Sequence, residues 1–408
     1  MATMAHKILT DRLPGLKTRD TAGEGLLADL QALVPDIRAA AQQAEAEGRI
    51  PQKTVQSLQN AGAFKAVVPK RYGGLELPYP YIPQIFRILG RGCTSTAWCM
   101  GFLVYHDFQF GHFPLEAQDE VWGGRGYTMA PGQVMPSGKA KEVDGGFELS
   151  GRWGYATGIH HGDWMLVSAP TEMRDGSTQM RRYFVPVDNC EVLDTWSVVA
   201  MKATGSDDVV IESAFVPKHR SMLVSDLRES RGEGLAHNPD PLWRMPLLSF
   251  MVLGAVGPFV GAAEALLEIV SEVMKVKVGA YSGEKQLSLM SQNIRIARLS
   301  MELDATVRLW EGHTEELWDD VCGGQQITPE RRQELRAVAS HVAKTCTTIC
   351  AELAGCVGSR SYYEDNPIQR FHRDISSLST HALFEYDHMA NLYGSVRMGV
   401  DLPPNAMV

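Results

Sequence analysis

The sequence predicts a mostly α-helical fold with a compact β-domain in its middle. Apolar residues recur at helical spacing from Leu26, alternate strictly between about Tyr127 and Pro217, and return to helical spacing from about Pro241. At 408 residues the chain exceeds one ordinary domain. We therefore expect an N-terminal helical domain at 1–125, a central β-domain at 126–235 and a C-terminal helical bundle at 236–408.

The composition is that of a soluble globular protein from a reducing compartment. Hydrophobic residues make up 44% of the chain and charged residues 21%, with a formal net charge of -9. This acidic balance, without any basic run, argues against a nucleic-acid partner. The seven cysteines are scattered and never spaced as CxxC, and the first residues show no secretory signal. We therefore expect a cytoplasmic protein without a metal site, and a loosely held arm over residues 1 to about 22.

The N-terminal part predicts helices on both sides of a glycine-containing turn. Helical spacing covers residues 26–44 and 51–61, a turn follows at Gly73 and Gly74, and a helix restarts near Tyr81. These signals predict a helical domain ahead of the β-rich region.

Residues 91–113 predict a helix buried against a flat partner, because small and aromatic residues alternate there with almost no charge. His106 lies in this stretch and is of a residue type that titrates near neutral pH. A single histidine on an apolar helix is either a hydrogen-bonded core residue or a catalytic one.

The central stretch 151–169 predicts a strand, a turn and a buried strand. Alternation through Trp153 and Tyr155 breaks at Gly158 and resumes in an apolar run. Thr157 places a hydroxyl beside a glycine, which lets a flat ligand approach the backbone closely. From these residues alone, a plain surface hairpin is the alternative.

The C-terminal part is typical of a four-helix bundle, with helical periodicity in Phe250–Val270, Leu287–Leu309, Arg331–Val357 and Ser376–Tyr393. The first segment is apolar enough to resemble a membrane span. Its two carboxylates and several glycines favour a buried bundle helix, so we expect no membrane contact. Asp374 stands where it can cap the N-terminus of the last helix.

Three motifs resemble the acyl-CoA dehydrogenase superfamily and occur in the same order. They are the Tyr-Ala-Thr-Gly run at 155–158, the Gly-Ser-Asp turn within 201–217, and the Arg-Asp pair within 358–375. With the Tyr-Gly-Gly-Leu run at 72–75, the resemblance covers nearly all of the chain after residue 24. It implies an acyl-CoA dehydrogenase-like fold, with an N-terminal helical domain, a middle β-barrel or sandwich and a C-terminal four-helix bundle. It also implies a homotetramer built as a dimer of dimers.

The resemblance further implies a flavin site. Tyr155 falls on the aromatic residue that covers the flavin, and Thr157 falls on the hydroxyl that bonds its N5. The other implied flavin contacts are Trp153, Gly158, Ser206, Gly355 and Gly358, the last two near the phosphate or adenine side. Because no GxGxxG follows a strand, we expect a separate NAD(P)H:flavin reductase to deliver FMNH2 or FADH2.

The residue at the usual base position separates two branches of the superfamily. Dehydrogenases of the commonest branch carry a Glu where this chain has Ala382, preceded by His381. That arrangement resembles the two-component, group D flavin-dependent aromatic monooxygenases, which include the hydroxylases of p-hydroxyphenylacetate, secosteroid phenols and indole. This oxygenase branch also has a substrate-contacting histidine in the helix that holds His106. Glu385, three residues after Ala382, could serve as the base in a dehydrogenase whose base has moved, so an acyl-CoA dehydrogenase is the alternative.

The implied reaction uses reduced flavin and O2, through a C4a-hydroperoxyflavin, to hydroxylate a planar aromatic substrate of phenol or indole type. A base makes the ring more nucleophilic, so His106 is the first candidate for that role. His381 would stabilise the peroxide, and Thr157 would protect it from loss as hydrogen peroxide. The expected apolar pocket walls are Trp98, Tyr105 and Phe108, beside His106. A sulfur- or amine-oxygenating enzyme of the same fold would share all of these motifs.

Overall fold

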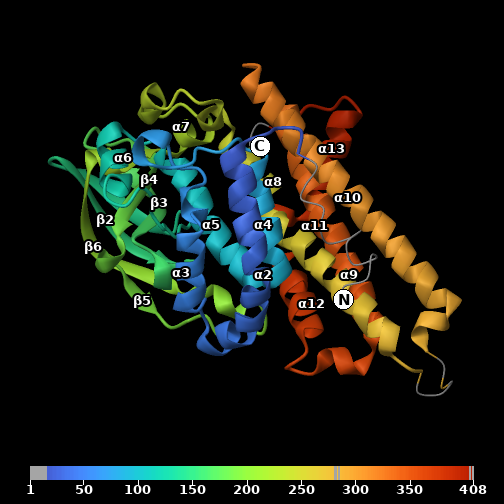
Figure 1. Cartoon of the computed structure of the whole chain (residues 1–408). Helices are drawn as coiled ribbons and strands as arrows, with labels where there is room; N and C mark the ends of the chain where they lie inside the picture. The colour runs from blue at the N-terminus through green and yellow to red at the C-terminus, as the bar shows by residue number, and fades with distance from the viewer. Residues whose placement is uncertain (1–15, 280–282, 284, 404–405, 407–408) are drawn as a thin grey trace.

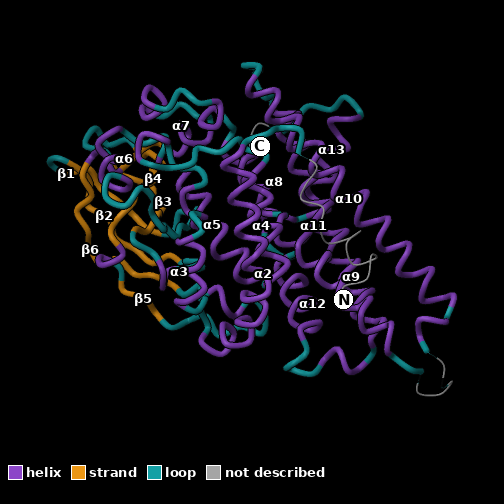
Figure 2. The backbone as a smooth tube through the Cα atoms, viewed as in Figure 1, coloured by secondary structure: helices purple, strands orange, loops and turns teal. Residues whose placement is uncertain are grey.

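The sheet lies at one end of the molecule, and most of the helices lie beside it in a bundle that extends to the other end (Figure 1). Figure 2 shows the strands gathered on that one side. The computed structural model describes residues 16–279, 283, 285–403 and 406. Most of the expected N-terminal arm lies outside the described residues. Its described part is not loose, because Leu16 is buried and Thr18 donates a hydrogen bond to Glu315.

Some of the described helices begin at a side-chain cap. Asp20 accepts the Gly23 N–H to start the first described helix, and Thr328 accepts the Arg331 N–H to start a later one. The α-helices are α2 (Thr21–Glu47), α3 (Gln52–Asn60), α4 (Tyr81–Gly92), α5 (Thr94–Phe110), α6 (Leu115–Trp122), α7 (Val224–Arg228), α8 (Leu247–Ala255), α9 (Gly257–Val276), α10 (Met290–Cys322), α11 (Pro329–Val357), α12 (Pro367–Leu378) and α13 (Tyr386–Arg397).

The strands form one open sheet among the described residues, in the order β5-β6-β2-β1-β3-β4-β7. Neighbours are antiparallel except β1 and β3, which run parallel. Along β4, Tyr183 and Val185 pack into the sheet's own core while Phe184 faces the helices, as the two-residue period requires. The strands are β1 (Gly138–Val143), β2 (Gly146–Trp153), β3 (Trp164–Glu172), β4 (Thr178–Pro186), β5 (Glu191–Leu193), β6 (Asp208–Pro217) and β7 (Ser221–Leu223).

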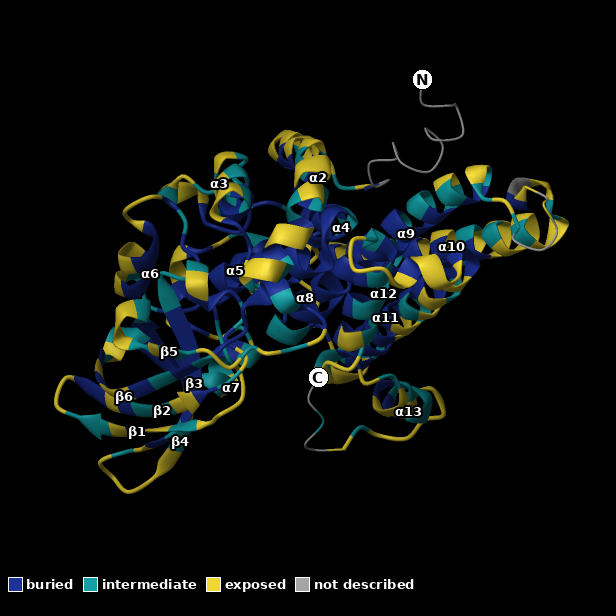
Figure 3. Cartoon of the chain, turned by 90° about the horizontal axis from the view of Figure 1, so that it is seen from below, coloured by how far each residue is buried: buried dark blue, intermediate teal, exposed yellow. Residues whose placement is uncertain are grey.

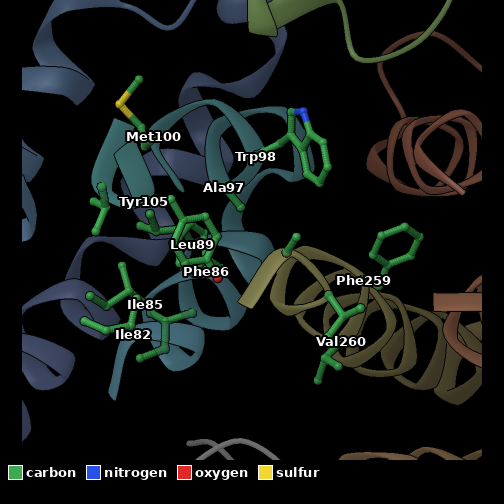
Figure 4. Packing of buried hydrophobic residues seen from close by; sticks show 14 of the residues in the cluster. Ile82, Ile85, Phe86, Leu89, Ala97, Trp98, Met100, Tyr105, Phe259 and Val260 are labelled. Atoms are coloured by element: carbon green, nitrogen blue, oxygen red, sulfur yellow. The ribbon is translucent and has the colours of Figure 1, made fainter. Parts of the chain in front are cut away.

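Helix α5 lies between the sheet and the bundle. It packs against α4, α8 and α9 on the bundle side and against the short helix η5 (Lys202–Thr204) on the other. Figure 3 shows the buried residues concentrated around α4, α5 and α8. Figure 4 shows buried side chains of α4 and α5 close to Phe259 and Val260 of α9. Gly101 makes this possible, because an added Cβ would lie 1.8 Å from the Phe86 ring. The expected helix at 91–113 is therefore the centre of the main core.

Three expectations about the bundle need correction. Phe250–Val270 is divided between α8 and α9, and Ser376–Tyr393 is not one helix, because a turn separates α12 from α13. Asp374 is not a cap. Asn366 caps α12 by accepting the Ile368 N–H, and Asp374 is buried inside the helix.

Leu247–Val276 is the one described stretch that is long and apolar enough to cross a membrane by composition. Within the structure, 94% of its most apolar 18-residue part is buried. This makes it weak evidence for a membrane span.

His112, just after α5, makes the fold sensitive to acid. Its side chain is 0% exposed, and neither ring nitrogen has a hydrogen-bond partner among the described residues. Burial lowers the pKa of His112 from 6.5 to about 4. Between these values the unfolded chain binds a proton that the folded chain does not, so stability falls as the pH falls.

We therefore predict that His112→Leu reduces the loss of stability between pH 6.5 and 5 by about 2 kcal/mol. Urea unfolding at both pH values measures this difference. His237→Leu, at an exposed histidine, is the control and should behave as wild type. Equal acid sensitivity in His112→Leu and wild type would show that His112 does not set it.

Candidate active site

The turn after β2 presents an aromatic ring and a hydroxyl side by side. Tyr155 has a left-handed backbone (φ 59°), and its side chain is 69% exposed. Its ring meets Trp196 edge-on, with 5.7 Å between ring centroids. A non-glycine residue in this conformation costs roughly 1–2 kcal/mol. The local structure therefore stabilises an exposed ring beside Thr157.

Gly158 fixes this turn against α5. It too is left-handed (φ 78°), and an added Cβ would lie 2.9 Å from Cys99 Sγ. Its N–H donates to the Thr204 carbonyl in η5 at 3.0 Å. The Thr157 hydroxyl lies 2.9 Å from Ser206 Oγ. The first two motifs and α5 therefore meet at one place.

A row of aromatic rings on α5 connects the two candidate histidines. Trp98, Phe102 and His106 follow one another at four-residue spacing, with ring centroids 4.6 Å and 5.7 Å apart. His381 lies next to Trp98 at 5.2 Å. Every residue of α5 except Phe102 is buried. Phe102 was not among the residues predicted from the sequence, although its spacing from Trp98 and His106 was a usable signal.

His106 is placed as a neutral base. Its Nδ1 lies 2.5 Å from the Ala130 carbonyl oxygen, which only accepts, so Nδ1–H donates and Nε2 keeps a free lone pair. The side chain is 1% exposed. Burial, reinforced by the nearby Arg182 guanidinium, lowers the pKa of His106 from 6.5 to about 3. The imidazole is therefore neutral across the physiological range.

Arg182, on β4, is a buried cation whose hydrogen-bond partners are all neutral. Its Nε donates to Gln109 Oε1 at 3.0 Å, and its Nη1 donates to Ser168 Oγ at 3.2 Å and to the Gln133 carbonyl. Burial lowers its pKa from 12.5 to about 9. Arg182 was not predicted from the sequence, although strand alternation places it on the same face as Phe184.

His381 has the opposite tautomer. Its Nδ1 accepts the Leu383 N–H at 3.2 Å, so the ring proton sits on Nε2. Its ring packs against Trp98 and Phe384, and partial burial lowers the pKa of His381, although the residue keeps an exposed face. It does not lie in the last helix, as expected, but precedes the short helix η11 (Ala382–Phe384). The site therefore offers a hydrogen-bond acceptor at one end and a donor at the other.

Three aromatic residues expected at the site lie in the cores instead. Trp153 is fully buried in the sheet's core, where its Nε1 donates to the Ser168 carbonyl at 3.1 Å. Tyr105 and Phe108 are buried against Phe250 of α8, with ring centroids 5.2 Å and 4.0 Å away. Aromatic residues at helical spacing carried no information on which rings face a ligand.

Gly355 and Gly358 lie at the exposed C-terminal end of α11, with no atom within 4 Å of an added Cβ. No described contact joins them to the Thr157 turn within this chain. Among the described residues, no three His, Cys, Asp or Glu side chains are grouped as metal ligands.

Comparison with known proteins identifies the family. The acyl-CoA dehydrogenase N-terminal domain matches residues 31–115, and its C-terminal domain matches residues 253–386. The pigment production hydroxylase of Rhodococcus sp. (strain ATCC 21145) is 30% identical over 93% of this chain and 97% of that protein. The chain belongs to the acyl-CoA dehydrogenase family.

Within the acyl-CoA dehydrogenase family, the chain belongs to the branch of flavin-dependent monooxygenase oxygenase components. The p-hydroxyphenylacetate 3-hydroxylase oxygenase component of Acinetobacter baumannii is 28% identical over 95% of this chain and 92% of that protein. The solved structure of XiaF from Streptomyces sp., in complex with FADH2 and glycerol, has a TM-score of 0.88 and 26% identity, and covers 94% of this chain and 98% of that one. The fold and branch expected from the three motifs are thereby confirmed.

Gly132 lets His106 and Arg182 approach the backbone, because an added Cβ would lie 2.8 Å from His106 Cε1 and 3.0 Å from Arg182 Nη2. We predict that Gly132→Ala displaces His106, costs about 1–3 kcal/mol of stability and slows aromatic product formation about 100-fold. Urea unfolding and product assays with reduced flavin measure the two effects. Gly312→Ala on α10, with open space around its Cβ, is the control: it should keep the wild-type rate and raise stability by about 0.5–1 kcal/mol, as expected inside a helix. Wild-type rates in Gly132→Ala would show that the position of His106 does not matter.

Proposed function

We propose that this chain is the oxygenase component of a two-component flavin-dependent monooxygenase that hydroxylates a planar aromatic substrate of phenol or indole type. The observation that carries the proposal is the pair of histidines with opposite tautomers at the two ends of one aromatic row on α5, the helix against which Gly158 of the Thr157 turn packs.

The residues of the Thr157 turn fit a flavin. Tyr155 leaves its ring exposed, and Gly158 carries no side chain where the backbone turns. Thr157 would hold N5, Tyr155 would cover the ring system, and Ser206 would support Thr157 from behind. When bound, FADH2 or FMNH2 supplies the electrons that activate O2 for transfer to the substrate.

His106 is placed to take a proton from the substrate, and because its pKa is lowered to about 3, the transfer depends on Arg182 stabilising the substrate anion. Its Nε2 lone pair is free, and the Ala130 carbonyl fixes the ring in this tautomer. Removing a phenol or indole proton raises the electron density of the ring that receives oxygen. The Arg182 guanidinium favours the anion produced and disfavours a protonated amine as substrate. This favours aromatic hydroxylation over oxygenation of an amine.

His381 is suited to donate a hydrogen bond from Nε2 toward the reacting oxygen. The next residue, Ala382, offers no carboxylate where dehydrogenases of the commonest branch have their base. This difference supports an oxygenase over an acyl-CoA dehydrogenase.

We also propose a homotetramer, with a separate flavin reductase and a cytoplasmic location suited to the seven free cysteines. The apolar helices expected to form the interfaces, α9 and α11, are largely buried within the chain. Helix α10 instead exposes Met290, Ile294 and Met301, with 76%, 61% and 66% of each side chain uncovered. This apolar face supports assembly, which would bring Gly355 and Gly358 to a neighbour's flavin.

We predict that His106→Ala slows hydroxylation by about 10²–10⁴-fold, the usual effect of a lost general base, without changing how fast reduced flavin reacts with O2. His381→Ala should slow that earlier reaction. Stopped-flow flavin absorbance and product analysis separate the two steps. His388→Ala, at an exposed residue of α13, is the control. If both variants change flavin affinity alone, the assigned roles are wrong.

We predict a particle of about 180 kDa by light scattering, as expected for four chains of 45.0 kDa. Ile294→Glu should dissociate it, because a charge on the apolar face of α10 disfavours burial. Glu302→Gln, at a neighbouring position of α10, is the control. A 45.0 kDa wild-type particle would contradict the proposed assembly.

A further inference from the structure

Three hydroxyl groups form a continuous chain behind the Thr157 turn. Thr157 Oγ1 lies 2.9 Å from Ser206 Oγ, which lies 2.8 Å from Thr204 Oγ1. Thr204 Oγ1 lies 2.9 Å from the carbonyl oxygen of Met201. On its inner side, this hydroxyl relay ends at an atom that can only accept a hydrogen bond.

The Met201 carbonyl sets the direction of every bond in the hydroxyl relay. A hydroxyl group has one proton, and Thr204 gives its proton to Met201. Ser206 must then donate to Thr204, and Thr157 must donate to Ser206. Thr157 Oγ1 is left with lone pairs only. Toward a bound ligand it therefore accepts hydrogen bonds and donates none.

Burial prevents water from reversing this direction. Thr204 and Ser206 are 2% and 3% exposed. Met201 is held in place because its N–H donates to Asp374 Oδ1 at 2.8 Å and its carbonyl also accepts from Trp196 Nε1 at 3.1 Å. The direction of the hydroxyl relay is thus a property of the protein itself.

We infer that the hydroxyl relay makes Thr157 select the redox state of the flavin. The inference rests on the proposed function, in which Thr157 faces flavin N5. In reduced flavin N5 carries a hydrogen that it can donate, whereas in oxidised flavin N5 offers only a lone pair. An accepting Thr157 binds the reduced form and repels the oxidised form. Ser206 and Thr204 act through Thr157 and are positioning residues.

The test is the ratio of the dissociation constants of oxidised and reduced flavin, measured by anaerobic titration. In Thr204→Val, Ser206 is free to donate to Thr157, so Thr157 can donate to oxidised N5. In Ser206→Ala, the Thr157 hydroxyl is free to turn either way. Each variant should lower the ratio about 2- to 10-fold, as expected for one hydrogen bond. A tenfold fall lowers the midpoint potential of the bound flavin by about 30 mV for a two-electron couple.

Two control variants separate the hydroxyl relay from general effects on the turn. Thr204→Ser keeps the hydroxyl and should keep the wild-type ratio. Thr195→Val removes a hydroxyl that accepts the Asp208 N–H next to the relay, and should also leave the ratio unchanged.

The outcomes distinguish this inference from the proposed function. If wild type prefers reduced flavin and neither Thr204→Val nor Ser206→Ala lowers the ratio, the hydroxyl relay does not set the preference, and the proposed function stands. Equal binding of both flavin forms by wild type would also overturn the inference. If wild type binds neither form, the proposed function itself fails.

Discussion

The buried carboxylate of Asp374 joins the three parts of the chain. From α12 it accepts the Met201 N–H at 2.8 Å and the Ser95 hydroxyl at 3.2 Å, and so ties the bundle to η5 and to the start of α5. Burial raises the pKa of Asp374, so its hydrogen bonds and the nearby Arg373 must offset a real desolvation cost. The position of α5 against the Thr157 turn, and hence the geometry of the whole site, depends on this contact.

The site assigns different chemistry to two histidines by giving each one backbone partner. A backbone carbonyl accepts the Nδ1–H of His106, and a backbone N–H donates to Nδ1 of His381. Neither effect requires a charged partner. The buried Arg182 opposes protonation of His106 and so keeps its imidazole neutral. Backbone groups thus fix the tautomers of both histidines, a role that a neighbouring carboxylate has in many enzymes.

The order of helices and strands followed from periodicity, because the change from helical spacing to alternation is large and local. Thr157, His106 and His381 were predicted through motifs; in the structure the two histidines lie at the ends of the aromatic row on α5, and the Thr157 turn packs against the same helix through Gly158. The predictions that failed depended on contacts between residues that are distant in the sequence. Asp374 looked like a cap, although Asn366 and Pro367 carried the stronger start signal. Burial decided that Trp153 faces the sheet core and that Phe102 is the half-buried ring. The bond between Thr157 and Ser206 joins residues 49 positions apart, which no local pattern reveals.

The contact between Gly158 and Cys99 affects the resistance of the enzyme to oxidation by hydrogen peroxide. An oxygenase that loses part of its activated oxygen releases hydrogen peroxide, which oxidises thiolates far faster than thiols. Cys99 lies directly behind the Thr157 turn, but it is fully buried and its pKa is raised by burial. Its sulfur therefore stays a protonated thiol. The cysteine packed against the site is protected from oxidative inactivation by the same tight packing that positions the turn.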